Sequence, residues 1–389
     1  MPSPTSSASG TRPHNLARIL RLVHEEGAQS RAALTETTGL NRSTIADLVG
    51  ELIRRGLVTE QIPAIPGRVG RPSPVVTASS AVVAIAVNPE VDAVEIAAIG
   101  LDRSIQTRER ILFPEPPSPE AVADLIAATV TRWAEGALED AAFVSVGIAV
   151  PGLVRASDGV VRNAPHLEWH DVPLADLVSS STGIPAVVGN DASLGVIAEH
   201  RYGAGVGIDD VVYLNGGASG IGGGLIVAGA PVVGAGGYAG EFGQNRPRIT
   251  DDADRRTADG VLEAEVSRWL LLDAVGIESA DDEELATAVA SSHDPEVAAE
   301  VSRQGRVLAS ALANAVNVLN PSVIVLGGFL ATLGELRGEE IADAVGMLAM
   351  RESAEGISIR SAALGPDRLL IGAAELAFAD LIAKPGEYS

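Results

Sequence analysis

From residue 81 onward the chain alternates short apolar segments that end in glycine with stretches of helical periodicity. The apolar segments are VVAIAV, VEIAAIGL, FVSVGIAVPG, PAVVGN, VVYLNGG, GGGLIVAG and VIVLGG, and the helical stretches include 119–138 and 300–319. Strands that alternate with helices are typical of an α/β domain. This part has about 310 residues, which is more than a typical single domain contains, so we expect it to form two lobes. Glycines at strand ends allow a ligand to approach the backbone closely.

Two residue types with reactive side chains are almost missing. The 389 residues include no cysteine and one lysine, Lys384, close to the C-terminus. This excludes disulfides, thiolate nucleophiles and Cys-ligated metal sites, and also a Walker-type phosphate loop or a Schiff-base lysine. No apolar run reaches the ~18 residues of a membrane span, and the start MPSPTSSASGTRP lacks the order of a secretory signal. We therefore expect a cytoplasmic protein with no membrane partner.

Charge is distributed unevenly along the chain. Residues 1–75 hold nine arginines and six acidic residues, a balance of +3, whereas the remainder holds 19 basic and 45 acidic residues, a balance of −26. Phosphate attracts the first part and repels the second, as a DNA-binding module joined to an acidic domain requires. A balance of +3 is weak for a DNA-binding module, so the residue pattern must decide.

Three helices are predicted in this first part. The first has apolar residues at i, i+3, i+4 and i+7 and ends near Gly27. Ser30 is placed to cap a second helix over 31–37, which Gly39 ends, and Asn41 is placed to cap a third that ends at Gly56. The residues expected to be buried are Leu16, Ile19, Leu20 and Val23 in the first helix and Ile45, Leu48, Val49, Leu52 and Ile53 in the third.

The second and third helices, joined by a short turn with a glycine, predict a helix-turn-helix. In such a motif the N-terminal residues of the later helix enter the major groove of DNA. Arg42 lies just inside the predicted cap, and Asp47 lies one turn further along. The residues expected to contact DNA here are Arg31, Asn41, Arg42, Ser43 and Thr44.

The segment after the third helix predicts a two-stranded wing. Leu57-Val58-Thr59-Glu60 and Val75-Val76-Thr77 flank the stretch IPAIPGRVGRPSP. Arginines between glycine and proline stay thin and extended, so we expect Arg68 and Arg71 to enter the minor groove. The alternative is a flexible linker with two solvated arginines.

The acidic part of the chain resembles the ROK family of repressors and sugar kinases. Six segments carry the resemblance in order: GIAVPGLV at 147–154, NAPHLEWHDVPLADL at 163–177, GNDASLGVIAEHRYGAG at 189–205, SGIGGGLIVAG at 219–229, GAGGYAGEFGQ at 234–244 and LNPSVIVLGG at 319–328. The resemblance implies an actin-like, hexokinase-like (ribonuclease H-like) body of two lobes. The preceding winged helix is similar to that of the family's transcription factors, whereas its plain kinases begin at the first lobe.

The resulting α/β domain plan has four parts. We expect a flexible tail over 1–12, a winged helix-turn-helix over 13–78, a first lobe over 79–188 plus about 367–385, and a second lobe over 189–366.

The resemblance also implies a sugar site. Asp191 corresponds to the carboxylate that takes the proton from the sugar hydroxyl in the kinases, and in a repressor it can simply accept hydrogen bonds from the sugar. The sugar-binding residues implied are Asn163, Asn190, Asp191, Glu241, Gln244 and Glu263. Each one alone reads as an ordinary loop residue, and only the order of the motifs supports the assignment.

Two departures bear on catalysis. Kinases of the family open the first lobe with Asp-x-Gly-x-Thr around the phosphates, whereas this chain has AVNPEV at 86–91, with no aspartate, no glycine and an added proline. Phe329 follows VLGG where kinases keep a small residue, and we expect its ring to crowd a nucleotide. The glycines of 220–224 argue weakly the other way, so Asp191 is expected to be a vestigial base and the chain no enzyme.

A third departure concerns metal. The family binds structural zinc through a histidine of G-E-x-G-H and three cysteines, but Gln244 stands at the histidine position and ITDDADRRTADGVLE replaces the cysteine segment, with Val261 at the last cysteine. We therefore expect no metal site and no cofactor. Because the lost histidine also contacts sugar in relatives, the effector is open.

Three hypotheses follow from the sequence. The leading one is a DNA-binding repressor of carbohydrate genes, which binds double-stranded operator DNA as a homodimer or homotetramer and responds to a small sugar or sugar phosphate. An ATP-dependent sugar kinase is the alternative, and a repressor without a ligand is the third. In the repressor hypothesis, a bound sugar changes the closure of the two lobes. Through a linker near 73–80 this changes the spacing of the two DNA-binding heads, which bind half-sites one helical turn apart.

Overall fold

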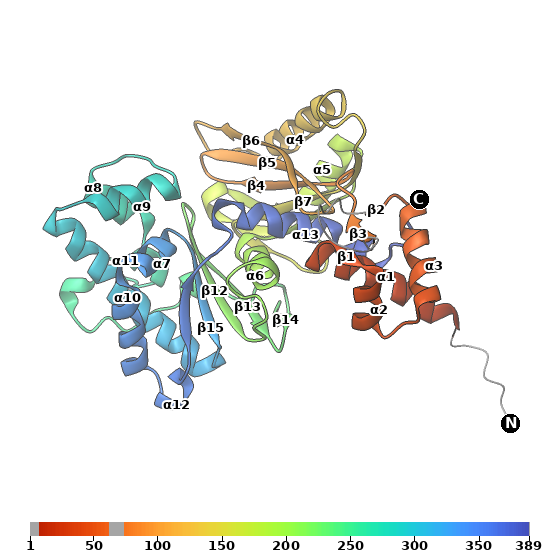
Figure 1. Ribbon diagram of the computed structural model, residues 1–389. Coiled ribbons are helices and arrows are strands. Elements are labelled where there is room, and N and C mark those ends of the chain that lie inside the picture. The colour runs from red at the N-terminus through yellow and green to blue at the C-terminus, as the bar shows by residue number, and fades with distance from the viewer. Residues whose placement is uncertain (1–7, 62–73, 389) are drawn as a thin grey trace.

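The computed structural model describes residues 8–61 and 74–388, which form a small head followed by two lobes (Figure 1). The head contains the N-terminal helices, and the first and second lobes follow in chain order. The final helix returns from the second lobe to the first and ends beside the head.

The head consists of three helices and a three-stranded sheet. Ser30 and Asn41 cap the second and third helices by accepting from the backbone N–H groups of Ala33 and Thr44, and Gly39 ends the second helix with a positive φ of 70°. The sheet order is β1-β3-β2, so the head has the element order of a winged helix-turn-helix. Its elements are α1 Ala8–Glu26, β1 Gln29–Ser30, α2 Arg31–Thr38, α3 Arg42–Arg54, β2 Val58–Gln61 and β3 Val75–Ala78.

Two details of the head differ from expectation. Helix α1 begins at Ala8, so residues 8–12 are helical rather than part of a flexible tail. Pro13 lies inside α1, in its second turn, where it removes one backbone hydrogen bond, and the neighbouring Arg12 pairs with Glu51 of α3 at 2.6 Å. Ile53 was expected to be buried with the apolar face of α3 but is 38% exposed.

The first lobe is built on the five-stranded sheet β11-β7-β4-β5-β6. Strand β4 is buried on both faces, because alternate residues point to opposite sides: Ala84 and Ala86 face α13, whereas Val83 and Ile85 face α4. The elements are β4 Val82–Pro89, β5 Ala93–Gly100, β6 Ile105–Leu112, α4 Pro119–Ala134, β7 Ala142–Val150, α5 Leu174–Thr182, β11 Ala186–Asn190 and α13 Arg368–Ala383, with a small sheet of β8 Leu153–Val154, β9 Val161–Ala164 and β10 Trp169–Val172.

The second lobe repeats this plan with the sheet β14-β13-β12-β15-β16. In each lobe the first three strands of the main sheet are antiparallel neighbours and the next two add in parallel beside the first. The repeated order is that of an actin-like body. The elements are α6 Asp191–Tyr202, β12 Val211–Gly217, β13 Gly220–Val227, β14 Ala230–Pro231, α7 Leu262–Glu265, α8 Arg268–Val275, α9 Asp282–Ser291, α10 Pro295–Leu319, β15 Val323–Gly328, α11 Phe329–Leu348, α12 Arg351–Ala354 and β16 Ser358–Ser361.

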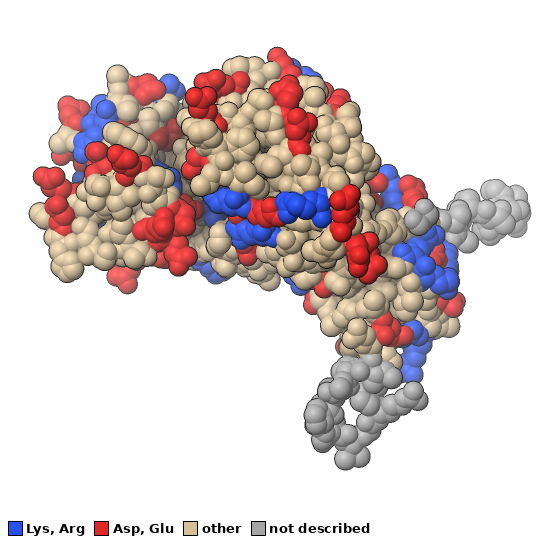
Figure 2. All heavy atoms as spheres, turned by 90° about the horizontal axis from the view of Figure 1, so that it is seen from above, with Lys and Arg blue, Asp and Glu red and all other residues tan. Residues whose placement is uncertain are grey.

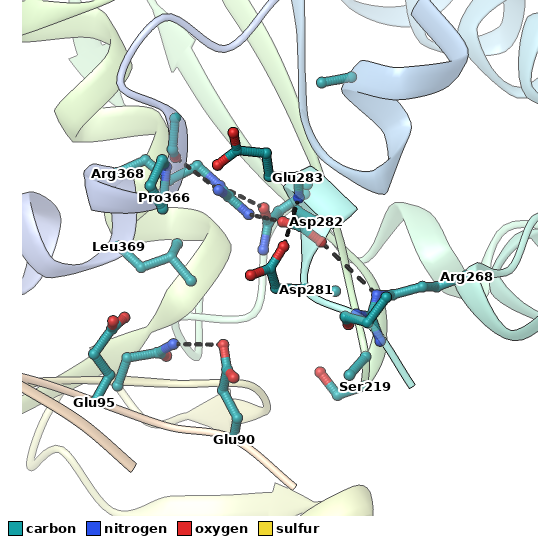
Figure 3. Close-up of a pocket in the computed structure, with 18 of the residues that line it drawn as sticks. Glu90, Glu95, Ser219, Arg268, Asp281, Asp282, Glu283, Pro366, Arg368 and Leu369 are labelled. Atoms are coloured by element: carbon teal, nitrogen blue, oxygen red, sulfur yellow. Dashed lines mark hydrogen bonds and ion pairs between the residues drawn. The ribbon is translucent and has the colours of Figure 1, made fainter. Parts of the chain in front are cut away.

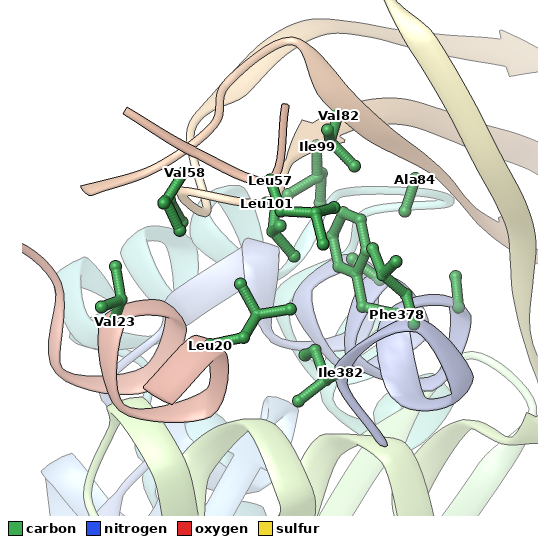
Figure 4. Packing of buried hydrophobic residues seen from close by; sticks show 14 of the residues in the cluster. Leu20, Val23, Leu57, Val58, Val82, Ala84, Ile99, Leu101, Phe378 and Ile382 are labelled. Carbon is green, nitrogen blue, oxygen red and sulfur yellow. The ribbon is translucent and has the colours of Figure 1, made fainter. Parts of the chain in front are cut away.

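The head is packed directly on the first lobe. One hydrophobic cluster joins Leu20 and Leu57 of the head to Leu101 of the lobe and to Phe378 and Ile382 of α13 (Figure 4). The segment near 73–80 was expected to be a linker. In its described residues it is instead part of the folded structure, because β3 ends at residue 78 and a short turn leads directly into β4. The head and α13 therefore share one hydrophobic core.

Among the described helices none is both long and apolar enough to cross a bilayer.

Candidate functional site

The start of helix α6 places two polar residues at the junction of the lobes. Asn190 ends β11 and caps α6, accepting from the backbone of Ser193 at 2.8 Å and donating to the carbonyl of Gly152 at 3.0 Å. Asp191 is 9% exposed and its Oδ1 accepts from the N–H of Ala192 at 2.8 Å. Burial raises the pKa of Asp191 to about 6, despite that hydrogen bond.

Asn163 lies on the small sheet beside this junction. A Cβ on Gly152 would lie 2.5 Å from the carbonyl oxygen of Asn163, so the segments touch. The side-chain Oδ1 of Asn163 is buried and accepts no hydrogen bond from any described residue. A buried acceptor without a donor is costly, and a ligand hydroxyl would satisfy it.

Glu241, Gln244 and Glu263 form the second-lobe side of the site. The side-chain amide of Gln244 donates to Oε1 of Glu263 at 2.5 Å, and Oε2 of Glu263 accepts from the backbone of Ile221 at 3.4 Å. Partial burial and the charge of Glu263 raise the pKa of Glu241. Gly220 lets the carboxylate come this close, because a Cβ there would lie 2.5 Å from Oε2 of Glu263.

Strand β13 connects the two groups. Gly220 lies beside Glu263. Gly222 is two residues further along on the same face of the strand, and a Cβ added there would lie 3.7 Å from Oδ1 of Asp191. The structure therefore brings the six implied sugar-site residues to one place, with three carboxyl groups and three amides. Such a set can accept from and donate to several hydroxyl groups of a neutral sugar.

A cleft of about 680 Å³ opens between the lobes next to Asp191. It is the side on which a kinase would hold its nucleotide phosphates, and it is acidic. Nine carboxyl-bearing residues line it, namely Glu90, Asp92, Glu95, Asp191, Asp281, Asp282, Glu283, Glu284 and Glu335. Four arginines line it, namely Arg108, Arg110, Arg268 and Arg368.

Each of these arginines is already paired with a carboxylate. Arg368 is nearly buried, donates to Asn215 at 3.0 Å and pairs with Asp282 at 3.5 Å, and Arg268 reaches the same Asp282 at 3.8 Å (Figure 3). On the opposite wall Arg108 pairs with Glu95 and Asp367, and Arg110 with Glu90 and Asp92. Among the lining residues no cation is left over for a phosphate.

The turn that replaces the phosphate loop is closed on itself. The side chain of Asn88 donates to Oε1 of Glu90 at 3.1 Å, and the N–H of Glu90 donates to the carbonyl of Ala93 at 2.7 Å. Burial raises the pKa of Glu90 in spite of Arg110. The turn thus presents a carboxylate where the phosphates of a nucleotide would lie.

The expectation for Phe329 was wrong. Its side chain is 1% exposed and packs in the core of the second lobe under Gly216, where a Cβ would lie 2.6 Å from the ring. The cleft wall here is made by Gly328, Ala331 and Thr332. The ring faces inward because the first residue of α11 follows a buried strand, so Phe329 does not crowd a nucleotide.

The segment that stands where relatives hold zinc is fixed by a buried ion pair. Glu265 accepts from the backbone N–H of Arg256 at 2.8 Å and of Thr257 at 2.9 Å, and lies 3.6 Å from Arg303. Arg303 also donates to the carbonyl of Asp254. Within the described ranges no group of three His, Asp or Glu side chains is placed to bind a metal.

The head exposes the start of α3. Arg42, Asn41 and Ser43 are exposed and Thr44 is half-buried, and Arg42 makes no ion pair with a described residue. Arg31 differs, because its guanidinium makes two hydrogen bonds of 2.7 Å to Glu60 of β2. Figure 2 shows basic residues on the head and also in a band across the body, with Asp and Glu beside them. The predicted wing arginines Arg68 and Arg71 lie outside the described residues.

Sequence reasoning missed two groups that the structure places at key positions. Arg368 and Asp282 bridge the cleft, and the buried Glu375 joins the first lobe to His24 of the head at 2.8 Å. The only indication in the sequence was a charged residue within each apolar helical stretch. A charged residue of this kind is as often exposed to solvent as it is buried in an ion pair, and its partner lies far away in the sequence.

These features define a two-lobed α/β protein of the sugar-kinase type that carries a small head of three helices and a three-stranded sheet. The chain matches the ROK family over residues 84–380 and belongs to that family. It is 25% identical to the xylose repressor of Caldicellulosiruptor bescii, over 96% of this chain and 98% of the relative. It is 30% identical to the glucokinase of Streptomyces coelicolor, over 68% of this chain and 88% of that enzyme.

A solved structure has a similar fold over nearly the whole chain. The crystal structure of a ROK family transcriptional regulator, a homologue of the E. coli MLC protein, matches 96% of this chain and 97% of its own with a TM-score of 0.77 and 21% sequence identity. The repressor and this regulator cover nearly the whole chain, head included. The glucokinase leaves about a third of it unmatched.

Proposed function

We propose that the protein is a sugar-responsive DNA-binding repressor of carbohydrate genes. The observation that carries the proposal is the contrast between the two sides of the interlobe site. The sugar side keeps Asn163, with its unsatisfied buried acceptor, and the carboxylate Asp191. The nucleotide side is lined, apart from Asp191, by eight carboxyl groups and by four arginines that are all ion-paired.

The effector is proposed to be a neutral sugar. Asp191, Glu241 and Glu263 surround the site with negative charge, which repels a sugar phosphate. Gln244 with Glu263 can position a hydroxyl as a His–Glu pair would. The full-length relatives named xylose repressors make D-xylose the first candidate, and the glucokinase relatives make D-glucose the second.

The DNA contact is proposed to be the start of α3. Arg42 is exposed and unpaired among the described residues and is proposed to reach a base edge. Asn41 caps the helix by accepting from the backbone N–H of Thr44, and Asn41, Ser43 and Thr44 are proposed to face the phosphates. Arg31 contributes only if its ion pair with Glu60 opens. Arg68 and Arg71 remain proposed minor-groove contacts.

A homodimer or homotetramer is proposed to bring two heads to the two half-sites of an operator. Binding of sugar between the lobes changes their closure, and the head follows because it is packed on α13 and on the first lobe. The spacing of the two heads then ceases to match the operator.

A kinase is the second candidate, favoured by the retained Asp191 and by the glucokinase relatives. Calorimetry with Mg-ATP and coupled ADP release with D-glucose and D-xylose separate the two. The proposal predicts no heat of nucleotide binding at millimolar ATP and no turnover. Saturable ATP binding with sugar-dependent ADP release would establish the kinase instead.

A further inference from the structure

A buried carboxylate lies where the head, the first lobe and the second lobe meet. Glu375 of α13 is 4% exposed, and its carboxylate accepts from three side chains. Oε1 accepts from Nε2 of His24 at 2.8 Å and from the hydroxyl of Tyr202 at 2.8 Å, and Oε2 accepts from the guanidinium of Arg201. Burial alone would raise the pKa of Glu375, but His24, Arg201 and Tyr202 hold it below its ordinary value.

His24 is the contact that the head contributes. Its Nδ1 lies 2.6 Å from the carbonyl of Leu101 and its ring meets Phe378 edge to face at 5.8 Å. Because the carbonyl and the carboxylate both accept, His24 makes both bonds only when both ring nitrogens carry a proton. The facing charged groups are Glu375 on α13 and, behind it, Arg201 on α6.

Helix α6 reaches from the sugar site to this carboxylate. Its first residue is Asp191 and its last two are Arg201 and Tyr202, so its 12 residues span about 18 Å. Between these ends α6 crosses α13 in backbone contact, where a Cβ on Gly372 would collide with the carbonyl of Leu194. A change in the crossing angle therefore moves the ends of α6 more than its middle.

The last turn of α6 also touches the end of α1. The guanidinium of Arg103 stacks on the ring of Tyr202 at 4.4 Å and lies beside Gly27, and Arg201 is 3.9 Å from Glu25. Both terminal residues of α6 thus contact groups that position α1, and α1 shares its core with α3.

We propose that α6 transmits sugar binding to the head through Glu375, with Arg201 and Tyr202 as positioning residues. This inference rests on the proposed function. A sugar held by Asn190 and Asp191 at one end of α6 shifts Arg201 and Tyr202 at the other. Glu375, which contacts both residues, then shifts the position of His24 and with it α1. Helix α3, which shares its core with α1, shifts together with α1.

The test compares Tyr202→Phe and Arg201→Gln with the matched control His200→Gln, a neighbour on α6 for which the structure shows no side-chain hydrogen bond. An operator duplex selected from random DNA by the wild-type protein is titrated by fluorescence anisotropy, with and without D-xylose or D-glucose. Sugar affinity is measured separately by calorimetry. Tyr202→Phe removes one oxygen and keeps the ring on Arg103, so it tests the inference even where Arg201→Gln unfolds.

The inference predicts that Tyr202→Phe keeps the sugar Kd and the sugar-free operator Kd within about two-fold, while the effect of sugar on operator affinity falls at least about five-fold. Hydrogen exchange of α1 should respond to sugar in the wild type and in His200→Gln but not in Tyr202→Phe. Unchanged coupling in both α6 variants would overturn the inference and leave the proposed function standing. A wild type that binds no sugar, or keeps its operator affinity when sugar is bound, overturns the proposed function and this inference with it.

Discussion

The side-chain amide of Gln244 lies 2.5 Å from Oε1 of Glu263, across the second-lobe side of the interlobe site. The resemblance to the ROK family implies a histidine at this position. Gln244, like a histidine, directs a side-chain N–H at a carboxylate. The proposed sugar site is therefore compatible with the missing zinc ligand.

Replacing Gln244 with alanine should weaken sugar binding about five- to ten-fold, because Glu263 loses the hydrogen bond that orients it, worth about 1 kcal/mol. Gln244→His should bind more tightly than Gln244→Ala. The measurement is calorimetry with the sugar that binds the wild type, and Asn245→Ala is the control on the adjacent residue. Equal affinities for Gln244→Ala and wild type would show that the pair does not contact the ligand.

Sugar affinity should fall as the pH drops through about 6, the pKa of the buried Asp191. Sugar hydroxyls donate to the ionised carboxylate, so protonation competes with binding and each further pH unit should cost up to about ten-fold. Asp191→Asn should lack this dependence and bind weakly at all pH values, while its operator affinity without sugar stays intact. A wild-type Kd that is flat between pH 5 and pH 7.5 would remove Asp191 from the contact.

The same raised pKa predicts a stability effect. Asp191 has a higher pKa folded than unfolded, so ionisation destabilises the native state, and stability falls as pH rises from about 4 to 6 and is then level. At pH 7.5 the free energy of unfolding of Asp191→Asn should therefore exceed that of the wild type by up to about 3 kcal/mol, and its urea midpoint should be higher. The difference should shrink at pH 5. A less stable Asp191→Asn at pH 7.5 would contradict this.

That the motif residues would lie together around Asp191 was predictable, because strand-end glycines and their neighbouring Asn, Asp and Glu stand in a recognisable order; that these residues bind a sugar stays a prediction. The start of α3 was predictable too, since Asn41 and Gly39 mark the turn locally. The pairing of Arg368 with Asp282 was not predictable. The pairing of His24 with Glu375 was not predictable either, because these two residues are 351 positions apart in the sequence. These contacts depend on how the lobes and head are packed, and no local pattern encodes that. The inward direction of Phe329 was also missed, because it depends on the core inside the second lobe, where the ring packs under Gly216.

Arg42→Ala should weaken specific operator binding by about 1 to 3 kcal/mol if the side chain reads a guanine. Arg21→Ala is the matched control, because Arg21 is also exposed and unpaired among the described residues but lies on α1. Anisotropy titrations at one fixed salt concentration give both affinities. Equal losses for the two variants would reduce Arg42 to a general charge contribution.

Glu265→Gln should destabilise the second lobe by about 1 to 3 kcal/mol, since it removes the charge 3.6 Å from Arg303, which keeps Glu300 at 2.7 Å, and weakens the bonds that Glu265 accepts from the N–H groups of Arg256 and Thr257. Asp259→Asn, exposed on the same segment, should be neutral. Urea unfolding measures both, and a chelator should not move the wild-type curve. A chelator-sensitive midpoint would show that a metal, and not Glu265, holds the segment.

The most direct test of the central claim is the affinity of the full-length protein for its selected operator, measured with and without a saturating sugar whose binding is established by calorimetry. The sugar-responsive repressor predicts that bound sugar raises the operator Kd by about 5- to 150-fold. An operator Kd that is unchanged by a bound sugar would contradict it, as would sugar-dependent ADP release near ~10 per second in the same preparation.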